Sequence, residues 1–152
     1  MKRLRNLLLG LMVIFGTAAG CSSFETQWEA AGAGLGPADG ITGRWVGTWE
    51  SEDNGHHGDL RAIVIANDDG TYNIHYHATY GTLFTLTYAY DLQDVKAEQR
   101  SGGDGAYHLA GDSDLGWFGT YSHQARVTPT HFIADYEASI GDFGSYRMQR
   151  PE

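Results

Sequence analysis

Histidine is the residue type in this chain with the clearest capacity for metal chemistry. The sequence contains seven histidines, and His75 and His77 are two positions apart, so both side chains leave the same face of an extended segment. His56 and His57 lie in a glycine-flanked loop over residues 54–59, which can supply a further ligand. Imidazole is a common ligand of Zn²⁺ and Cu²⁺. One hypothesis is therefore a Zn or Cu site built from these four histidines. The alternative places His75 and His77 in solvent, opposite the apolar face of their segment.

The other reactive residues do not indicate catalysis, and we expect that the protein is not an enzyme. Most Asp and Glu residues lie in turn-like segments, where they favour chain reversal and solubility. No Gly-x-Ser-x-Gly nucleophile elbow occurs, and Gly102-Gly103 does not precede a helical pattern as a phosphate-binding loop would. Asp135 and Glu137 share one strand face but have no recognisable catalytic neighbours there.

Arg61 is a candidate binding residue because it follows the histidine loop and shares its strand face with Ile63 and Ile65. A guanidinium group on an apolar face either pairs with a carboxylate or binds an anionic group. Of these two interpretations we favour the ion pair, at one end of the fold.

The first twenty residues have the architecture of a cleaved export signal. Lys2, Arg3 and Arg5 form a basic region, residues 7–15 form an apolar stretch, and small residues follow at 16–20. The apolar stretch has the length of a secretory signal and is too short for a stable membrane span. We therefore expect residues 1–20 to be removed on export.

The only cysteine, Cys21, directly follows these small residues. Residues 18–21 (AAGC) resemble the bacterial lipobox, with Ala18 in place of the commoner Leu. In that family the cysteine thiol receives a diacylglycerol and the new N-terminus is acylated, typically with palmitate, which anchors the protein stably. The resemblance implies a lipoprotein held at a membrane of the cell envelope through Cys21. Ser22 and Ser23, in place of Asp, favour the outer membrane.

Composition separates a tether from the rest of the exported chain and limits its partners. Residues 21–40 are rich in Gly and Ala and predict a flexible tether, with a weak helical signal near residues 24–31. Removal of the signal leaves seven basic residues against nineteen acidic ones, a formal charge of −12. Such a charge repels nucleic acid and anionic lipid, so we expect no nucleic-acid partner and attribute membrane attachment to the lipid.

Residues 41–152 predict an all-β domain. Segments of alternating apolar and polar residues are bounded by Gly, Asp and Asn, and the segment 71–80 is the clearest of them. The polar segment 93–100 either continues a strand over 82–92 or forms a separate one, which predicts eight or nine strands. Short turns indicate antiparallel neighbours. A closed up-and-down barrel hides the apolar face and removes free edges, and a two-sheet β-sandwich is the alternative.

The first predicted strand carries a motif of known barrel families. Gly43, Trp45 and Gly47 form a Gly-x-Trp-x-Gly pattern. Gly-x-Trp in this position resembles the calycin superfamily, which includes lipocalins, fatty-acid-binding proteins and avidins. In lipocalins the Trp packs across the closed end of the barrel and an Arg near the last strand covers it. The resemblance implies that role for Trp45, with Arg147 or Arg150 as the cover.

Aromatic residues on the predicted inner face favour a ligand-binding barrel. Eight strands enclose room for packed side chains or for one small ligand, and buried tyrosines bring hydroxyls that can orient an amphipathic molecule. We therefore expect non-catalytic binding of a small apolar or amphipathic ligand. A structural or protein-interaction lipoprotein with a filled barrel is one alternative, and an envelope metal-binding protein is another. The residues expected to contact the ligand are Trp45, Arg61, Tyr76, Tyr80, Tyr88, Trp117 and Tyr121.

Overall fold

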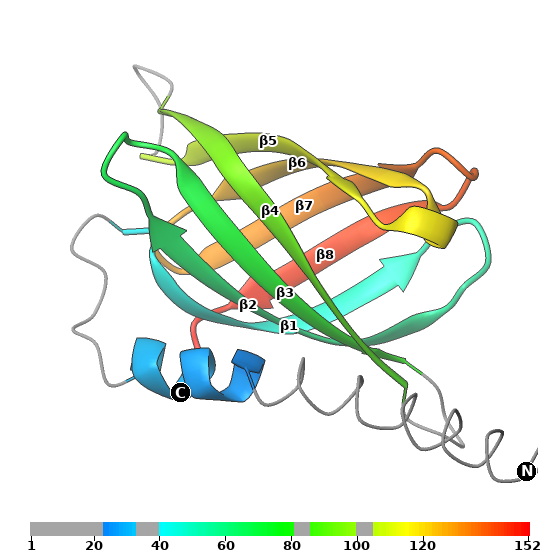
Figure 1. The fold of residues 1–152 in the computed structure, drawn as a ribbon, viewed down its shortest axis with the longest axis horizontal. Coiled ribbons are helices and arrows are strands. Elements are labelled where there is room, and N and C mark those ends of the chain that lie inside the picture. Colours follow the sequence, from blue (N-terminus) through cyan, green and yellow to red (C-terminus); the bar gives the residue numbers. More distant parts are fainter. Residues whose placement is uncertain (1–22, 33–39, 81–85, 100–104) are drawn as a thin grey trace, which may run out of the picture.

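Eight antiparallel strands form a closed barrel in which each strand pairs with the next and the last pairs with the first (Figure 1). A computed structural model of the chain describes residues 23–32, 40–80, 86–99 and 105–152. The predicted up-and-down barrel is confirmed, with eight strands, and closure excludes the sandwich alternative. The elements are β1 (Gly43–Ser51), β2 (His57–Ala66), β3 (Tyr72–Tyr80), β4 (Leu86–Gln99), β5 (Tyr107–Asp114), the 3-10 helix η1 (Gly116–Phe118), β6 (Thr120–Val127), β7 (His131–Ala138) and β8 (Phe143–Gln149).

Strand β4 is one continuous strand of 14 residues, and no boundary separates residues 93–99 from the rest. Its buried side chains are Tyr90 and Leu92 and then Val95, so the inward alternation changes parity within the strand. An irregularity in its register with β3, between Tyr72 and Ile74, accommodates this change. Residues 93–99 therefore continue β4 and do not form a separate strand, because a shift of parity rather than a turn interrupts the sequence pattern there.

Trp45 closes one end of the barrel. Its side chain is fully buried, its Nε1 donates a hydrogen bond to the Ile41 carbonyl at 3.0 Å, and its ring meets Phe132 edge to face. The guanidinium carbon of Arg150 lies 3.9 Å from the centre of the Trp45 ring. Arg150 also donates to the main-chain carbonyl of Thr42 at 2.7 Å. Of the two candidate arginines, Arg150 is the one that covers the tryptophan.

Backbone geometry explains both glycines of the Gly-x-Trp-x-Gly pattern. Gly43 has φ +99°, a conformation that other residues rarely adopt, and it turns the chain into β1. Gly47 lies so close to β8 that a Cβ atom would overlap the main-chain carbonyl of Arg147. The motif therefore combines an entry turn, the closing tryptophan and the close approach of β1 to β8.

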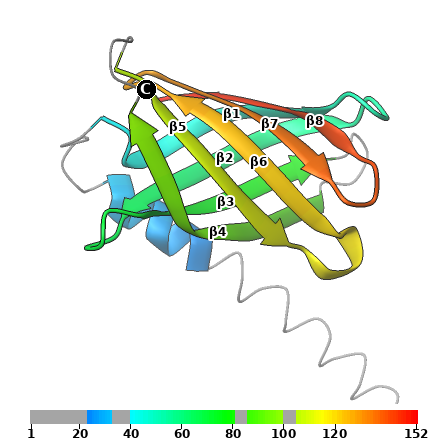
Figure 2. The ribbon, with the colours of Figure 1, turned by 90° about the horizontal axis from the view of Figure 1, so that it is seen from above.

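A helix over residues 23–32 lies against the outside of the barrel (Figures 1 and 2). The ring of Phe24 is buried and stacks on His77 of β3, with 4.8 Å between ring centroids. The guanidinium carbon of Arg61 lies 5.1 Å from the Phe24 ring centroid and 5.2 Å from that of Trp28. Within the described ranges no helix is both long and apolar enough to cross a membrane.

The helix over residues 23–32 lies within the predicted tether, at the place of the weak helical signal. Phe24 and Trp28 lie one helical turn apart, so both project from the same side of the helix. That side covers polar residues on the outer face of the barrel, and this tertiary contact stabilises a segment whose local helical signal is weak.

Candidate functional site

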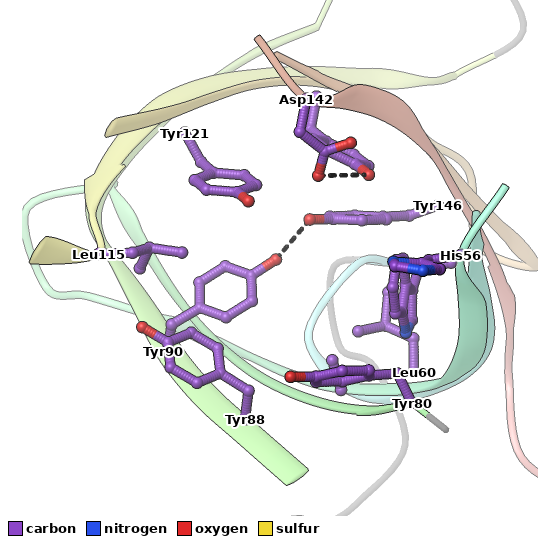
Figure 3. Close-up of a pocket in the computed structure, with 12 residues that line it drawn as sticks. His56, Leu60, Tyr80, Tyr88, Tyr90, Leu115, Tyr121, Asp142 and Tyr146 are labelled. Carbon is purple, nitrogen blue, oxygen red and sulfur yellow. Dashed lines mark hydrogen bonds between the residues drawn. The ribbon is translucent and has the colours of Figure 1, made fainter. Parts of the chain in front are cut away.

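A cavity of about 300 Å³ opens at the end of the barrel opposite Trp45 (Figure 3). This volume is at the lower end of the range for small-molecule sites. The cavity lies where β1 and β3 end and where β6 and β8 begin, and most of its wall is aromatic or aliphatic. The lining residues are Trp49, His56, Leu60, Ala78, Tyr80, Tyr88, Tyr90, Leu115, Tyr121, Tyr136, Asp142 and Tyr146.

Strand alternation places these side chains inside. Successive residues of a strand point to opposite faces, so Ala78 and Tyr80 of β3 and Tyr88 and Tyr90 of β4 project inward together. Trp49 follows Trp45 by two inward positions along β1. Its Nε1 donates to the main-chain carbonyl of Thr79 at 2.9 Å, which fixes the indole at the mouth.

Neutral hydroxyl groups form the floor of the cavity. The hydroxyls of Tyr90 and Tyr146 are 2.7 Å apart and point toward one another (Figure 3). The Nε2 atom of His123 lies 3.4 Å from the first hydroxyl and 3.3 Å from the second. Burial raises the pKa of both tyrosines, so both keep their protons. One hydroxyl donates to the other, and the second proton is available to His123 or to a ligand.

Asp142 is the charged residue of the cavity. Its carboxylate accepts hydrogen bonds from the Ser51 hydroxyl at 2.5 Å and from the Tyr136 hydroxyl at 3.4 Å. Burial, together with the negative charge of Asp142, raises the pKa of Tyr136. Among the described residues no Lys or Arg forms an ion pair with Asp142. Within the described part of the chain, the groups that donate hydrogen bonds to this carboxylate are therefore neutral.

The residues expected to contact a ligand separate into three groups. Tyr80, Tyr88 and Tyr121 line the cavity. Tyr76 is buried beneath it, where its ring stacks on that of Tyr90 at 4.9 Å. The other three predicted contacts lie elsewhere, at the closed end, on the outer wall and on the exposed surface of η1: Trp45, Arg61 and Trp117.

The prediction missed several residues that line the cavity. Trp49, Tyr90 and Tyr146 project inward by the same alternation that places Tyr80 and Tyr88, so strand parity contained the signal. For Asp142 the sequence contained no such signal. This residue lies in the turn before β8, where an acidic residue is typical of turn chemistry alone.

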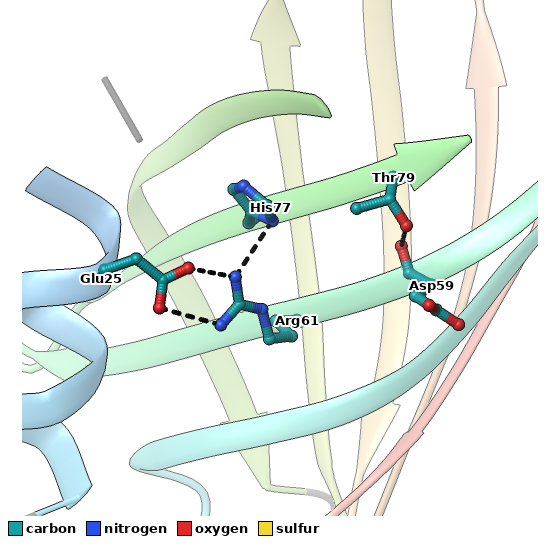
Figure 4. A network of polar contacts seen from close by, with 5 residues as sticks. All are labelled: Glu25, Asp59, Arg61, His77 and Thr79. Atoms are coloured by element: carbon teal, nitrogen blue, oxygen red, sulfur yellow. Dashed lines mark hydrogen bonds and ion pairs between the residues drawn. The ribbon is translucent and has the colours of Figure 1, made fainter. Parts of the chain in front are cut away.

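Arg61 forms the predicted ion pair, but its partner is the helix outside the barrel and not a residue at the barrel end. The guanidinium group binds both carboxylate oxygens of Glu25 and lies 3.5 Å from Nδ1 of His77 (Figure 4). Burial lowers the pKa of His77, and the positive charge of Arg61 adds to this effect. His77 is therefore neutral near pH 7, and Arg61 is a residue that docks the helix.

The four histidines of the metal hypothesis do not converge. His75 pairs with Asp91 at 2.6 Å, and His77 is covered by the helix, so the expectation that it faces solvent is wrong. His56 lines the cavity mouth, and His57 is exposed nearby. The described part of the chain contains no group of three or more His, Cys, Asp or Glu residues able to hold a metal ion.

The burial of His123 predicts that the stability of the folded protein depends on pH. Burial lowers its pKa from 6.5 to about 4, so below pH 6.5 the unfolded chain binds a proton that the folded protein resists. Stability should be unaffected by this group above pH 6.5 and should fall as the pH drops toward 4, by at most about 3 kcal/mol. Urea unfolding of the wild type and of His123→Gln at pH 7 and pH 4.5 measures the effect.

The His123→Gln variant should lose less stability between the two pH values than the wild type. His131→Gln is the matched control because His131 is exposed, and its pH dependence should equal that of the wild type. An identical loss in His123→Gln and wild type would show that His123 does not titrate as its burial requires.

Comparison of the chain with protein-family models, with curated proteins and with solved structures found no match to any of them.

Proposed function

We propose that this protein is a lipid-anchored protein of the cell envelope that binds a small amphipathic molecule in the open end of its barrel, without catalysis. The observation that carries this proposal is the cavity of about 300 Å³, with aromatic walls and a floor of hydroxyl groups. Aromatic walls bind the apolar part of a ligand, and a few polar groups orient it. A barrel filled throughout with side chains would leave no such space, so the cavity favours a carrier over a purely structural protein.

The charge of the site defines the class of ligand. Asp142 repels an anionic group, and aromatic faces attract cations and N–H donors. Tyr90 and Tyr146 offer one further proton at the floor. The ligand is therefore a small amphipathic molecule whose apolar part has the size of a ring system. Its polar part is either neutral and hydrogen-bonding or positively charged.

A pair of fluorescent probes tests this proposal. N-phenylnaphthylamine is neutral and bears one N–H group, and anilinonaphthalene sulfonate has the same skeleton with an added anionic group. The chain from residue 22 onward, which retains the docked helix, should enhance the fluorescence of the neutral probe and bind the sulfonate more weakly. Asp142→Asn should reduce the difference in affinity between the two probes, because it removes the charge that repels the sulfonate.

Filling the cavity should weaken binding of the neutral probe. Ala78 lines the cavity wall, so a phenyl ring at this position occupies space that the ligand needs. We expect Ala78→Phe to weaken probe binding at least about tenfold, since a loss of only 1.4 kcal/mol suffices. Ala110→Phe is the matched control, because Ala110 is exposed on β5. Equal binding by the two variants and the wild type would place the probe outside the barrel and contradict the proposal.

A further inference from the structure

Large apolar side chains are exposed at the open end of the barrel. Trp117 in η1 is fully exposed, Ile140 in the turn between β7 and β8 is 62% exposed, and Phe143 at the start of β8 is 45% exposed. The two segments that carry them touch, since the main-chain amide of Ser139 donates to the carbonyl of Thr120 at 2.8 Å. Figure 1 shows η1 and the β7–β8 turn at the same end of the barrel. We call Trp117, Ile140 and Phe143 the apolar rim.

The outer helix directs its N-terminus toward the same end. Phe24, in the first turn, packs on His77, which is three residues from the mouth end of β3. Gly32, the last helical residue, lies against the guanidinium group of Arg44, the second residue of β1 at the closed end. Figures 1 and 2 both show the first turn of the helix, in the darkest blue, nearer the mouth than the last turn. Cys21 precedes the helix by two residues, which span at most about 7 Å.

We propose that the apolar rim docks on the lipid bilayer in which Cys21 is anchored, so that the mouth of the cavity faces the membrane. This proposal rests on the lipid anchor of the proposed function. Tryptophan and other large apolar side chains favour the interfacial region of a bilayer. The short connection to a helix that is itself fixed to the barrel brings the bilayer to the mouth end. An amphipathic ligand can then pass between bilayer and cavity without crossing bulk water.

Charge at the mouth determines which lipid surface the apolar rim fits. The described turns at this end contain Glu52, Asp53 and Asp142 and no Lys or Arg, and Asp114 ends β5 beside them. Acidic side chains within a Debye length of anionic headgroups are repelled by them. The rim therefore suits a zwitterionic surface and not an anionic one.

Quenching by spin-labelled lipid tests the orientation. The full chain, exported and purified with its anchor, is reconstituted into phosphatidylcholine vesicles that contain a nitroxide-labelled phosphatidylcholine. Acylation consumes the only native thiol, so Thr120→Cys, at an exposed position beside the rim, provides a single site for a fluorophore. Asp68→Cys, in the β2–β3 turn at the closed end, is the matched control. We expect severalfold stronger quenching of the label at position 120, and weaker quenching in phosphatidylglycerol vesicles.

Two further variants, each carrying the label at position 120, distinguish docking of the apolar rim on the bilayer from chance proximity of the label to the bilayer. The double substitution Trp117→Ser with Ile140→Ser should reduce the quenching. Ile65→Ser with Ile133→Ser should not, since these residues are exposed on the barrel wall to 41% and 39%. Equal quenching at both ends, or quenching that survives loss of the rim, overturns the rim proposal. A mass spectrum without acyl chains on Cys21 refutes the lipid anchor of the proposed function, and the rim proposal fails with it.

Discussion

Replacing Trp45 with alanine should lower the free energy of unfolding by about 3 to 5 kcal/mol, the range for deleting a large buried aromatic side chain. Trp45 is fully buried, donates to the Ile41 carbonyl and carries the Arg150 guanidinium group on its face. The substitution leaves a void at the closed end and removes the ring on which Arg150 rests. Urea unfolding at pH 7 measures the loss.

Trp117→Ala provides the comparison for this result. Trp117 is fully exposed, so its removal should change the free energy of unfolding by no more than about 0.5 kcal/mol. If Trp45→Ala were as stable as Trp117→Ala, the closed end would not depend on Trp45, and the role assigned to the Gly-x-Trp-x-Gly motif would be wrong.

Replacing Cys21 with serine should eliminate incorporation of labelled palmitate into the protein. A hydroxyl group cannot replace the thiol that receives the diacylglycerol in bacterial lipoproteins, and the chain has no second cysteine. Cells that express the wild type and the variant are grown with labelled palmitate, and the isolated proteins are compared. Ser22→Ala is the control, because it changes the neighbouring residue and leaves the thiol. Equal labelling of Cys21→Ser and wild type would contradict lipidation at this residue.

The sequence predicted the barrel because period-two alternation is strong where one face is buried. In β3 the inward positions Ile74 and Tyr76 are buried, as the alternation requires. The number of strands was less certain from sequence, since the register irregularity opposite β4 shifts the parity at Val95 and resembles a strand boundary. Such a shift is defined by pairing with a neighbouring strand and is therefore not visible in a single segment.

The parts of the site that the sequence did not predict depend on contacts between distant segments. Asp142 and Ser51 are 91 positions apart and meet only when β8 closes against β1. Glu25 and Arg61 meet only because the helix lies on the barrel wall. The expectation that His77 is solvated failed for the same reason. The pattern of β3 places His77 on the outer face of the barrel, but it does not show that the helix covers this face.

Native mass spectrometry of the mature, anchored protein, purified from cell envelopes in mild detergent, directly detects a ligand in the barrel. We expect a co-purified organic molecule, small enough for a cavity of about 300 Å³, that is released on unfolding and is absent from Ala78→Phe but present in Ala110→Phe. The bare mass of the acylated chain in all three proteins, together with no binding of N-phenylnaphthylamine, would contradict a ligand-binding barrel.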